Sequence, residues 1–139
     1  MALRTKYGAL PNVTWHDPVP REVAQDMMHR CDALYVGFKS SPLYELSGVS
    51  PNKFFDYCAA ARPVLEVCDE AFSLTDKAQN GLRQNPGDPV RLAQTLNSLM
   101  QLTPSELTAM GQRGREWVLK EASPAVLAER FISAVAAAS

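Results

Sequence analysis

The sequence predicts an α/β domain in which a parallel sheet is flanked by helices and followed by a helical C-terminal region. In the first half, short apolar runs of strand length alternate with segments of helical periodicity. In the second half, a capping residue followed by proline occurs three times, which predicts three helices. The length of 139 residues and the 46% hydrophobic content suit one core, so residues 1–139 are predicted to form a single domain.

Four segments are predicted to be strands. Residues 12–16 alternate β-forming and polar residues until Pro18 and Pro20, which cannot donate to a sheet ladder, interrupt the pattern. Residues 33–38 are a continuous apolar run, which is typical of a buried strand. The other two predicted strands are residues 64–68 and the brief segment 82–84.

Three helices are predicted between these strands, and three more after them. Apolar residues recur every four positions over 20–31, and a stripe of Phe54, Tyr57, Cys58 and Ala61 predicts a helix that begins at Pro51 and stops before Pro63. Residues 71–80 are predicted as a short helix that Gly81 ends. The three later helices are predicted to begin after the capping residues Asp88, Thr103 and Ser123. The second of them carries Gly111 and Gly114, which allow a close approach to a neighbour. The apolar stripe of the last helix is Leu127, Phe131 and Val135.

The charge balance disfavours nucleic acid and an anionic membrane surface as partners. Fourteen Lys and Arg against 15 Asp and Glu give a net charge of -1, with no clustered basic run. No apolar stretch approaches the roughly 18 to 20 residues that span a bilayer, and the N-terminus lacks the apolar centre of a secretory signal. These features predict a cytoplasmic protein without a transmembrane segment.

The cysteines and histidines predict neither a disulfide framework nor a metal site. Cys31, Cys58 and Cys68 are odd in number and have no C-x-x-C spacing, so we expect three small buried apolar residues. His16 and His29 have no Cys, Asp or Glu at metal-ligand spacing.

The segment from Ser50 onward is the strongest candidate site. Ser50 is predicted to cap a helix that starts on the ligand-binding side of the sheet, where the free amides of Asn52 and Lys53 and the Lys53 ammonium suit a phosphate. Asp56, about one turn later, suits the vicinal hydroxyls of a ribose. The alternative is a capped core helix on which Lys53 and Asp56 are simply solvated. No glycine-rich phosphate motif is present.

Four colinear segments carry a family resemblance: NVTWHDPVPREV, CDALYVGF, GVSPNKFFDYCAAARPVLEV and NPGDPVRLAQTL. From Asn12 to its end, the chain resembles the C-terminal half of retaining glycosyltransferases of the GT-B fold, more narrowly the bacterial type that builds surface polysaccharides. The resemblance implies a Rossmann-like domain that binds a nucleotide-diphosphate sugar as substrate, without a cofactor. It also implies an N-terminal acceptor domain as the partner across a cleft, with a glycan or a lipid-linked molecule as acceptor.

The same resemblance implies roles for individual residues. The family's second glutamate, which holds the ribose, falls on Asp56, and the diphosphate-binding amides fall on Asn52 and Lys53. The family's first glutamate, which touches the donor sugar, falls on Gly48, so the pattern is broken there and Glu45 is the candidate to replace it. The loop from Asp17 to Val19 matches a region that meets the base.

The chain also lacks one part of the domain that the resemblance implies. Relatives have a first strand and a basic loop before the segment that starts at Asn12, and Arg4 and Lys6 do not match that loop. We therefore expect a partial GT-B C-terminal domain that is inactive alone, with an exposed sheet edge or cleft surface that favours a homodimer. The alternative function is a non-catalytic α/β interaction domain that retains the scaffold without a working site, which Gly48 favours.

Overall fold

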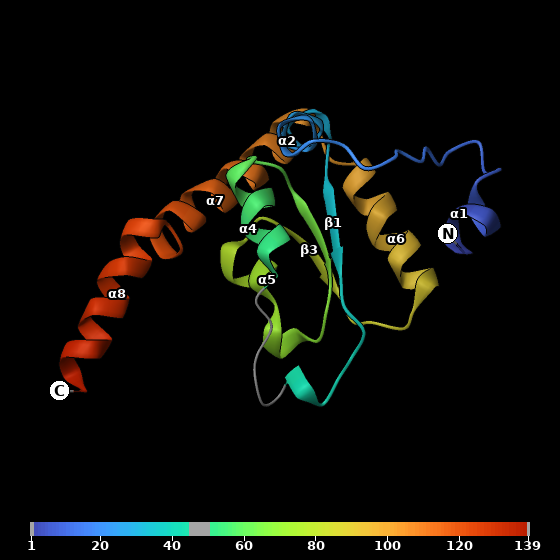
Figure 1. Cartoon of the computed structure of the whole chain (residues 1–139). Helices are drawn as coiled ribbons and strands as arrows, with labels where there is room; N and C mark the ends of the chain where they lie inside the picture. Colours follow the sequence, from blue (N-terminus) through green and yellow to red (C-terminus); the bar gives the residue numbers. More distant parts are fainter. Residues whose placement is uncertain (1, 45–50, 139) are drawn as a thin grey trace.

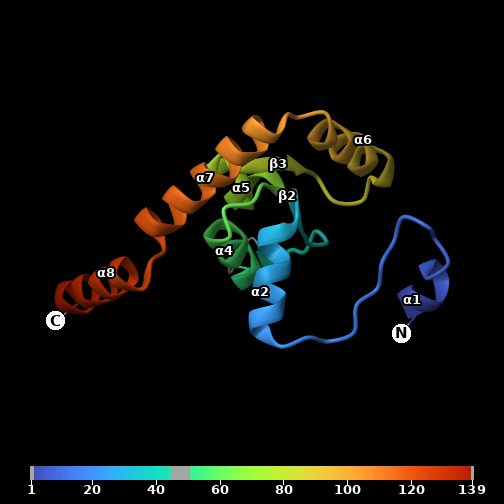
Figure 2. The same cartoon turned by 90° about the horizontal axis from the view of Figure 1, so that it is seen from above.

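A three-stranded parallel sheet forms the centre of the molecule. The structure is a computed structural model that describes residues 2–44 and 51–138, and its strands follow the order β1 (Leu34–Gly37), β2 (Val64–Val67), β3 (Gly81–Gln84). Leu34 lies beside Val64, and Val64 lies beside Gly81. Helices α4 and α6 lie on opposite sides of the sheet (Figures 1 and 2). The prediction of an α/β domain with a parallel sheet flanked by helices is confirmed.

The helices surround this sheet and continue beyond it. They are α1 (Ala2–Tyr7), α2 (Arg21–Arg30), α4 (Asn52–Ala59), the 3-10 helix η1 (Glu70–Phe72), α5 (Leu74–Ala78), α6 (Pro89–Met100), α7 (Pro104–Glu121) and α8 (Pro124–Ala137).

The three caps predicted for the C-terminal helices are confirmed. The side chains of Asp88, Thr103 and Ser123 each accept a hydrogen bond from a backbone amide in the first turn of α6, α7 and α8. The Glu106 carboxylate accepts from the Thr103 amide at 2.7 Å, which completes a capping box. The hydrogen bonds from Thr103 lower the pKa of Glu106.

The prediction of a strand at residues 12–16 is wrong. This segment has no ladder partner and lies in irregular chain between α1 and α2, with Val13 exposed and Trp15 half-buried. Alternating apolar and polar residues stabilise a strand only when a neighbouring strand accepts its hydrogen bonds and covers its apolar face. Within the described residues, no strand lies beside this segment.

Two predicted helices end differently from expectation. Ala61 lies beyond the end of α4 in the left-handed region, with φ 53, so it does not extend the helix. Residues 71–80 are divided between η1 and α5 because the Ser73 hydroxyl accepts from the Asp76 amide and starts a new helix. Gln79, with φ 50, ends α5, whereas Gly81 belongs to β3.

The core lies between the sheet and helices α4 and α7. Phe54 and Cys58 of α4 pack with Val36, Val64, Ala78 and Val118, and all six side chains are buried. Trp117 packs edge-to-face on Phe54 with ring centroids 5.9 Å apart. β2 is buried along its whole length, whereas Tyr35 of β1 is 54% exposed. The strand predicted at residues 33–38 is present as β1, but the expectation that it is buried is wrong, since its burial is confined to Val36.

The long C-terminal arm is partly exposed. Figures 1 and 2 show α8 extending away from the sheet at the end of α7. The predicted apolar stripe of α8 faces solvent, and Phe131 is 71% exposed. No helix in residues 2–44 and 51–138 is long and apolar enough to cross a membrane.

The thiols differ in exposure, and this difference gives a testable result. Cys58 and Cys68 are buried as predicted, whereas Cys31 is exposed, which corrects the expectation for that residue. Burial, together with the charge of Glu66, raises the pKa of Cys58 and of Cys68 from 9.0 to about 12. Because the thiolate is the reactive form, iodoacetamide at pH 8 should label Cys31 alone in the folded protein.

Mass spectrometry of the labelled peptides measures this outcome, and all three cysteines should react in denaturant. Rapid labelling of Cys58 in the folded protein would contradict the buried position of α4. The folded-state pKa values lie above the unfolded ones, so these thiols contribute stability at neutral pH that is lost as the pH rises from about 9 towards 12. A denaturation series over that pH range checks the sign.

Candidate functional site

A cavity lies where β1 ends and α4 begins. Its volume is about 420 Å³, and its walls are Tyr35, Val36, Gly37, Phe38, Pro51, Asn52 and Lys53. The carboxyl end of a parallel strand and the start of the following helix thus share one cavity. In open α/β sheets, ligands bind at this edge.

The first turn of α4 supplies hydrogen-bond donors to this cavity. The helix starts at Asn52, one residue later than predicted, and Pro51 is its N-cap with an extended backbone and no side-chain capping bond. The Phe54 amide donates to the Pro51 carbonyl at 2.9 Å. The amides of Asn52 and Lys53 precede the first residue that can donate to a carbonyl inside the helix, so both can bind an anion together with the helix dipole.

A second cavity, of about 320 Å³, lies between α4 and α2. Its walls are Arg21, Ala24, Gln25, Met28, Leu34, Lys53, Asp56 and Tyr57. Lys53 lines both cavities, and Asp56 lies on the same face of α4 because the two residues are three positions apart. One ligand that spans both cavities would therefore place an anionic group in the first cavity and a group that binds the Asp56 carboxylate in the second. Lys53 would lie between these two groups.

Tyr57 lines the second cavity, and its surroundings shift its pKa. Burial raises the pKa of Tyr57 above 10.0, and the neighbouring charges of Asp56 and Cys31 raise it further. The Tyr57 phenol therefore keeps its proton at neutral pH. Lys53 and Arg21 place two cations beside the one carboxylate of Asp56.

The structure does not bring every predicted site residue to these two cavities. Asp17 and Val19 lie on the irregular segment before α2, and neither lines the two cavities. Asp17 instead accepts a hydrogen bond from Arg4 at 2.7 Å. The contact of this loop with a base stays a prediction.

Three predicted residues lie outside the described part of the chain. They are Glu45, Gly48 and Ser50. Their roles at the donor site stay predictions, whereas the expectation that Ser50 caps α4 is wrong, because Pro51 is the N-cap of that helix.

Sequence reasoning missed the contribution of α2 to the site. Arg21 and Gln25 lie off the apolar stripe of this helix and were not among the candidate site residues, yet both line the second cavity. Their spacing of four residues, which places them on one helix face, was the available signal.

Three charged residues outside the two cavities have structural contacts that the sequence did not predict. Glu66 is 1% exposed and accepts hydrogen bonds from the Ser73 hydroxyl and the Thr75 amide. Arg113 and Arg115 lie on α7. They donate to the backbone carbonyls of Gln79 and Ala59, at the C-terminal ends of α5 and α4.

Metal coordination and similarity to known proteins give no further assignment. Within residues 2–44 and 51–138, no group of three His, Cys, Asp or Glu side chains is arranged to hold a metal ion. The chain matches no protein-family model, no curated protein and no solved structure.

Proposed function

We propose that the chain binds a nucleotide-diphosphate sugar, as the donor-binding part of a retaining glycosyltransferase of surface polysaccharide biosynthesis. The observation that carries this proposal is the position of Lys53 between two adjacent cavities. Asn52 and Lys53, at the start of α4, line the first cavity, and Lys53 and Asp56 line the second. Phosphate groups and ribose hydroxyls occur side by side in this class of ligand.

Each part of the ligand has a chemical counterpart at the two cavities. The diphosphate lies at the start of α4, where the amides of Asn52 and Lys53 and the Lys53 ammonium provide charge-assisted hydrogen bonds. Asp56 accepts hydrogen bonds from the vicinal hydroxyls of the ribose. Arg21 offsets the repulsion between the Asp56 carboxylate and the diphosphate, since it lines the same cavity.

The proposed chemistry is positional and electrostatic. Transfer of the sugar leaves a nucleoside diphosphate, and the same donors that bind the diphosphate stabilise the negative charge that develops on it. The reaction also needs the acceptor held against the donor, so the proposal assigns the acceptor site to a separate domain. The chain alone is then expected to bind the donor without transferring the sugar.

Separate titrations with UDP, GDP, their sugars and inorganic pyrophosphate, by calorimetry or NMR, test the proposal. Lys53→Ala should weaken pyrophosphate and nucleotide binding by roughly tenfold or more, because it removes a charge-assisted contact. Asp56→Ala should weaken the binding of nucleotides but not of pyrophosphate, which has no ribose. Lys120→Ala, on an exposed part of α7, is the matched control and should change neither.

Two results would contradict the proposal. One is the absence of any nucleotide or nucleotide-sugar binding up to about 10 mM ligand while the circular dichroism spectrum shows a folded protein. The other is an equal effect of Lys53→Ala and Lys120→Ala, which would indicate non-specific attraction of anions.

The second candidate function is a non-catalytic interaction domain. The exposed apolar side chains of α8, among them Leu127, Phe131 and Ile132, favour it. Intact folding with no nucleotide binding, together with self-association, would support this alternative.

A further inference from the structure

Among residues 2–44 and 51–138, one edge of the sheet is unpaired along β1. The Leu34 amide donates to the Pro63 carbonyl and the Phe38 amide donates to the Val67 carbonyl, so this side of the strand faces β2. Backbone groups alternate in direction along a strand, which places those of Tyr35 and Gly37 on the other side. No described strand pairs with that side. Such an edge is a template for another strand.

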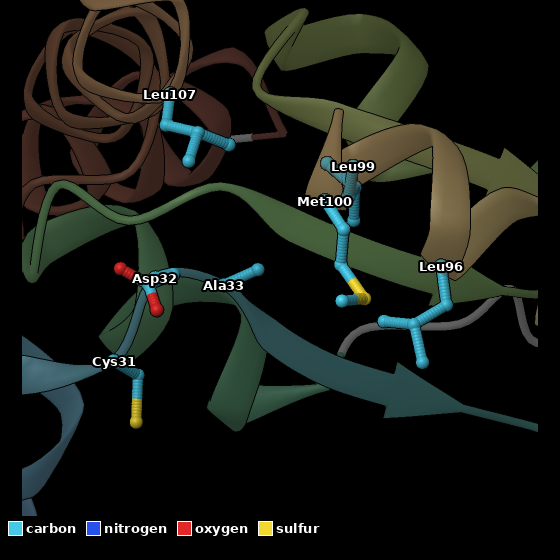
Figure 3. A pocket seen from close by; sticks show the side chains of 7 residues that line it. All are labelled: Cys31, Asp32, Ala33, Leu96, Leu99, Met100 and Leu107. Carbon is cyan, nitrogen blue, oxygen red and sulfur yellow. The ribbon is translucent and has the colours of Figure 1, made fainter. Parts of the chain in front are cut away.

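An apolar cavity lies beside the start of this edge. It has a volume of about 540 Å³ and is lined by Cys31, Asp32, Ala33, Leu96, Leu99, Met100 and Leu107. Figure 3 shows the side chains of Ala33 and Met100 between the Asp32 carboxylate and Leu96. The cavity therefore has apolar walls and a single carboxylate, and Met100 in its wall is 72% exposed.

The two ends of the edge carry opposite charges at matching positions. Asp32 lies two residues before β1, and Lys39 lies two residues after it. Both residues are exposed, and neither forms an ion pair within the part of the chain that the structure describes. A second strand with the same charges in the opposite direction would pair both ends.

We propose that a second copy of this chain pairs with β1 in antiparallel orientation, through a two-fold axis near the middle of the strand. The Tyr35 and Gly37 backbone groups of both copies then form the ladder, and the two sheets become one six-stranded sheet. The axis places the Lys39 end of each strand against the Asp32 end of the other.

The cavity matches the side chain that this pairing delivers. A lysine has an apolar stem and a cationic tip. The stem of the partner's Lys39 covers Ala33 and Met100, and its ammonium meets the Asp32 carboxylate. An acidic or a basic peptide would match only one end of the edge, whereas a second copy matches both ends and makes each contact twice. This inference does not depend on nucleotide binding.

Sedimentation velocity of the full chain at about 100 μM protein tests the oligomeric state. The wild-type chain should be a dimer. Lys39→Glu and Asp32→Lys should each weaken dimerisation by roughly tenfold or more, because each creates two like-charge contacts. The double variant with both substitutions should restore the dimer, since the charges are exchanged. Phe131→Glu, on the exposed stripe of α8, is the control and should leave the dimer unchanged.

Amide hydrogen exchange gives a second readout that is specific for strand pairing. The amides of Tyr35 and Gly37 should exchange at least roughly tenfold more slowly in the dimer than in the Lys39→Glu monomer. A monomeric wild-type chain, a double variant that stays monomeric, or a dimer lost in Phe131→Glu but not in Lys39→Glu would overturn the proposal. Equal exchange of these amides in dimer and monomer would also overturn it.

Discussion

Gly111→Ala is expected to destabilise the domain by roughly 3 kcal/mol, although alanine is the better helix former. A Cβ atom at Gly111 would lie 2.0 Å from the Ala61 carbonyl oxygen and 3.0 Å from the Arg62 nitrogen. These are backbone atoms in the turn that connects α4 to β2, so they cannot rotate away as a side chain would. Accommodating the methyl group requires α7 to move away from the core formed by Phe54 and Val118.

Urea denaturation monitored by tryptophan fluorescence measures the loss. The matched control is Gln112→Ala, because Gln112 is the next residue of α7 and is exposed. The control should change the free energy of unfolding by no more than about 0.5 kcal/mol. Equal stabilities of Gly111→Ala and Gln112→Ala would show that α7 does not lie as close to the turn as the structure places it.

Glu66→Ala is expected to cost roughly 3 to 4 kcal/mol of folding free energy. One carboxylate oxygen of Glu66 accepts from the Ser73 hydroxyl and from the Thr75 amide, both at 2.9 Å, in a buried setting. Removal of the side chain leaves a cavity next to β2 and a buried amide without an acceptor. It also releases the start of α5, because the Ser73 hydroxyl that caps this helix is held by the same carboxylate.

Glu66→Gln separates the two contributions to this loss. It preserves the volume and one oxygen acceptor, so its effect should be smaller than that of Glu66→Ala. Glu116→Ala, on an exposed position of α7, is the control for removal of a carboxylate and should change stability by no more than about 0.5 kcal/mol. If Glu66→Ala were as mild as Glu116→Ala, the buried position of the carboxylate would be incorrect.

The features that depend on local chemistry were predictable from the sequence. The caps of α6, α7 and α8 each need only a side-chain oxygen before a proline, and all three form as expected. The close approach at Gly111 was also predicted, since a glycine on the buried face of a helix indicates a near neighbour. Strands β1 and β2 lie within the predicted ranges 33–38 and 64–68, and β3 overlaps the predicted range 82–84.

The candidate site was predicted only in part. Asn52, Lys53 and Asp56 lie at cavities beside the start of α4, as the sequence suggested. The wall that α2 contributes through Arg21 was not predicted, because the sequence does not specify which surface one helix presents to another. Asp17 was placed near the base by resemblance alone, and its partner in the structure is Arg4.

The sequence by itself determined the α/β class, the parallel sheet of β1, β2 and β3 and the helix starts with strong capping residues, because those features depend on neighbours a few positions apart. Only the tertiary structure decided that Glu66 holds the start of α5 and that, in the part of the chain that the structure describes, residues 12–16 do not pair and β1 is an open edge. Strand pairing and the burial of a carboxylate depend on groups distant in the chain, whose positions follow from packing and not from local pattern.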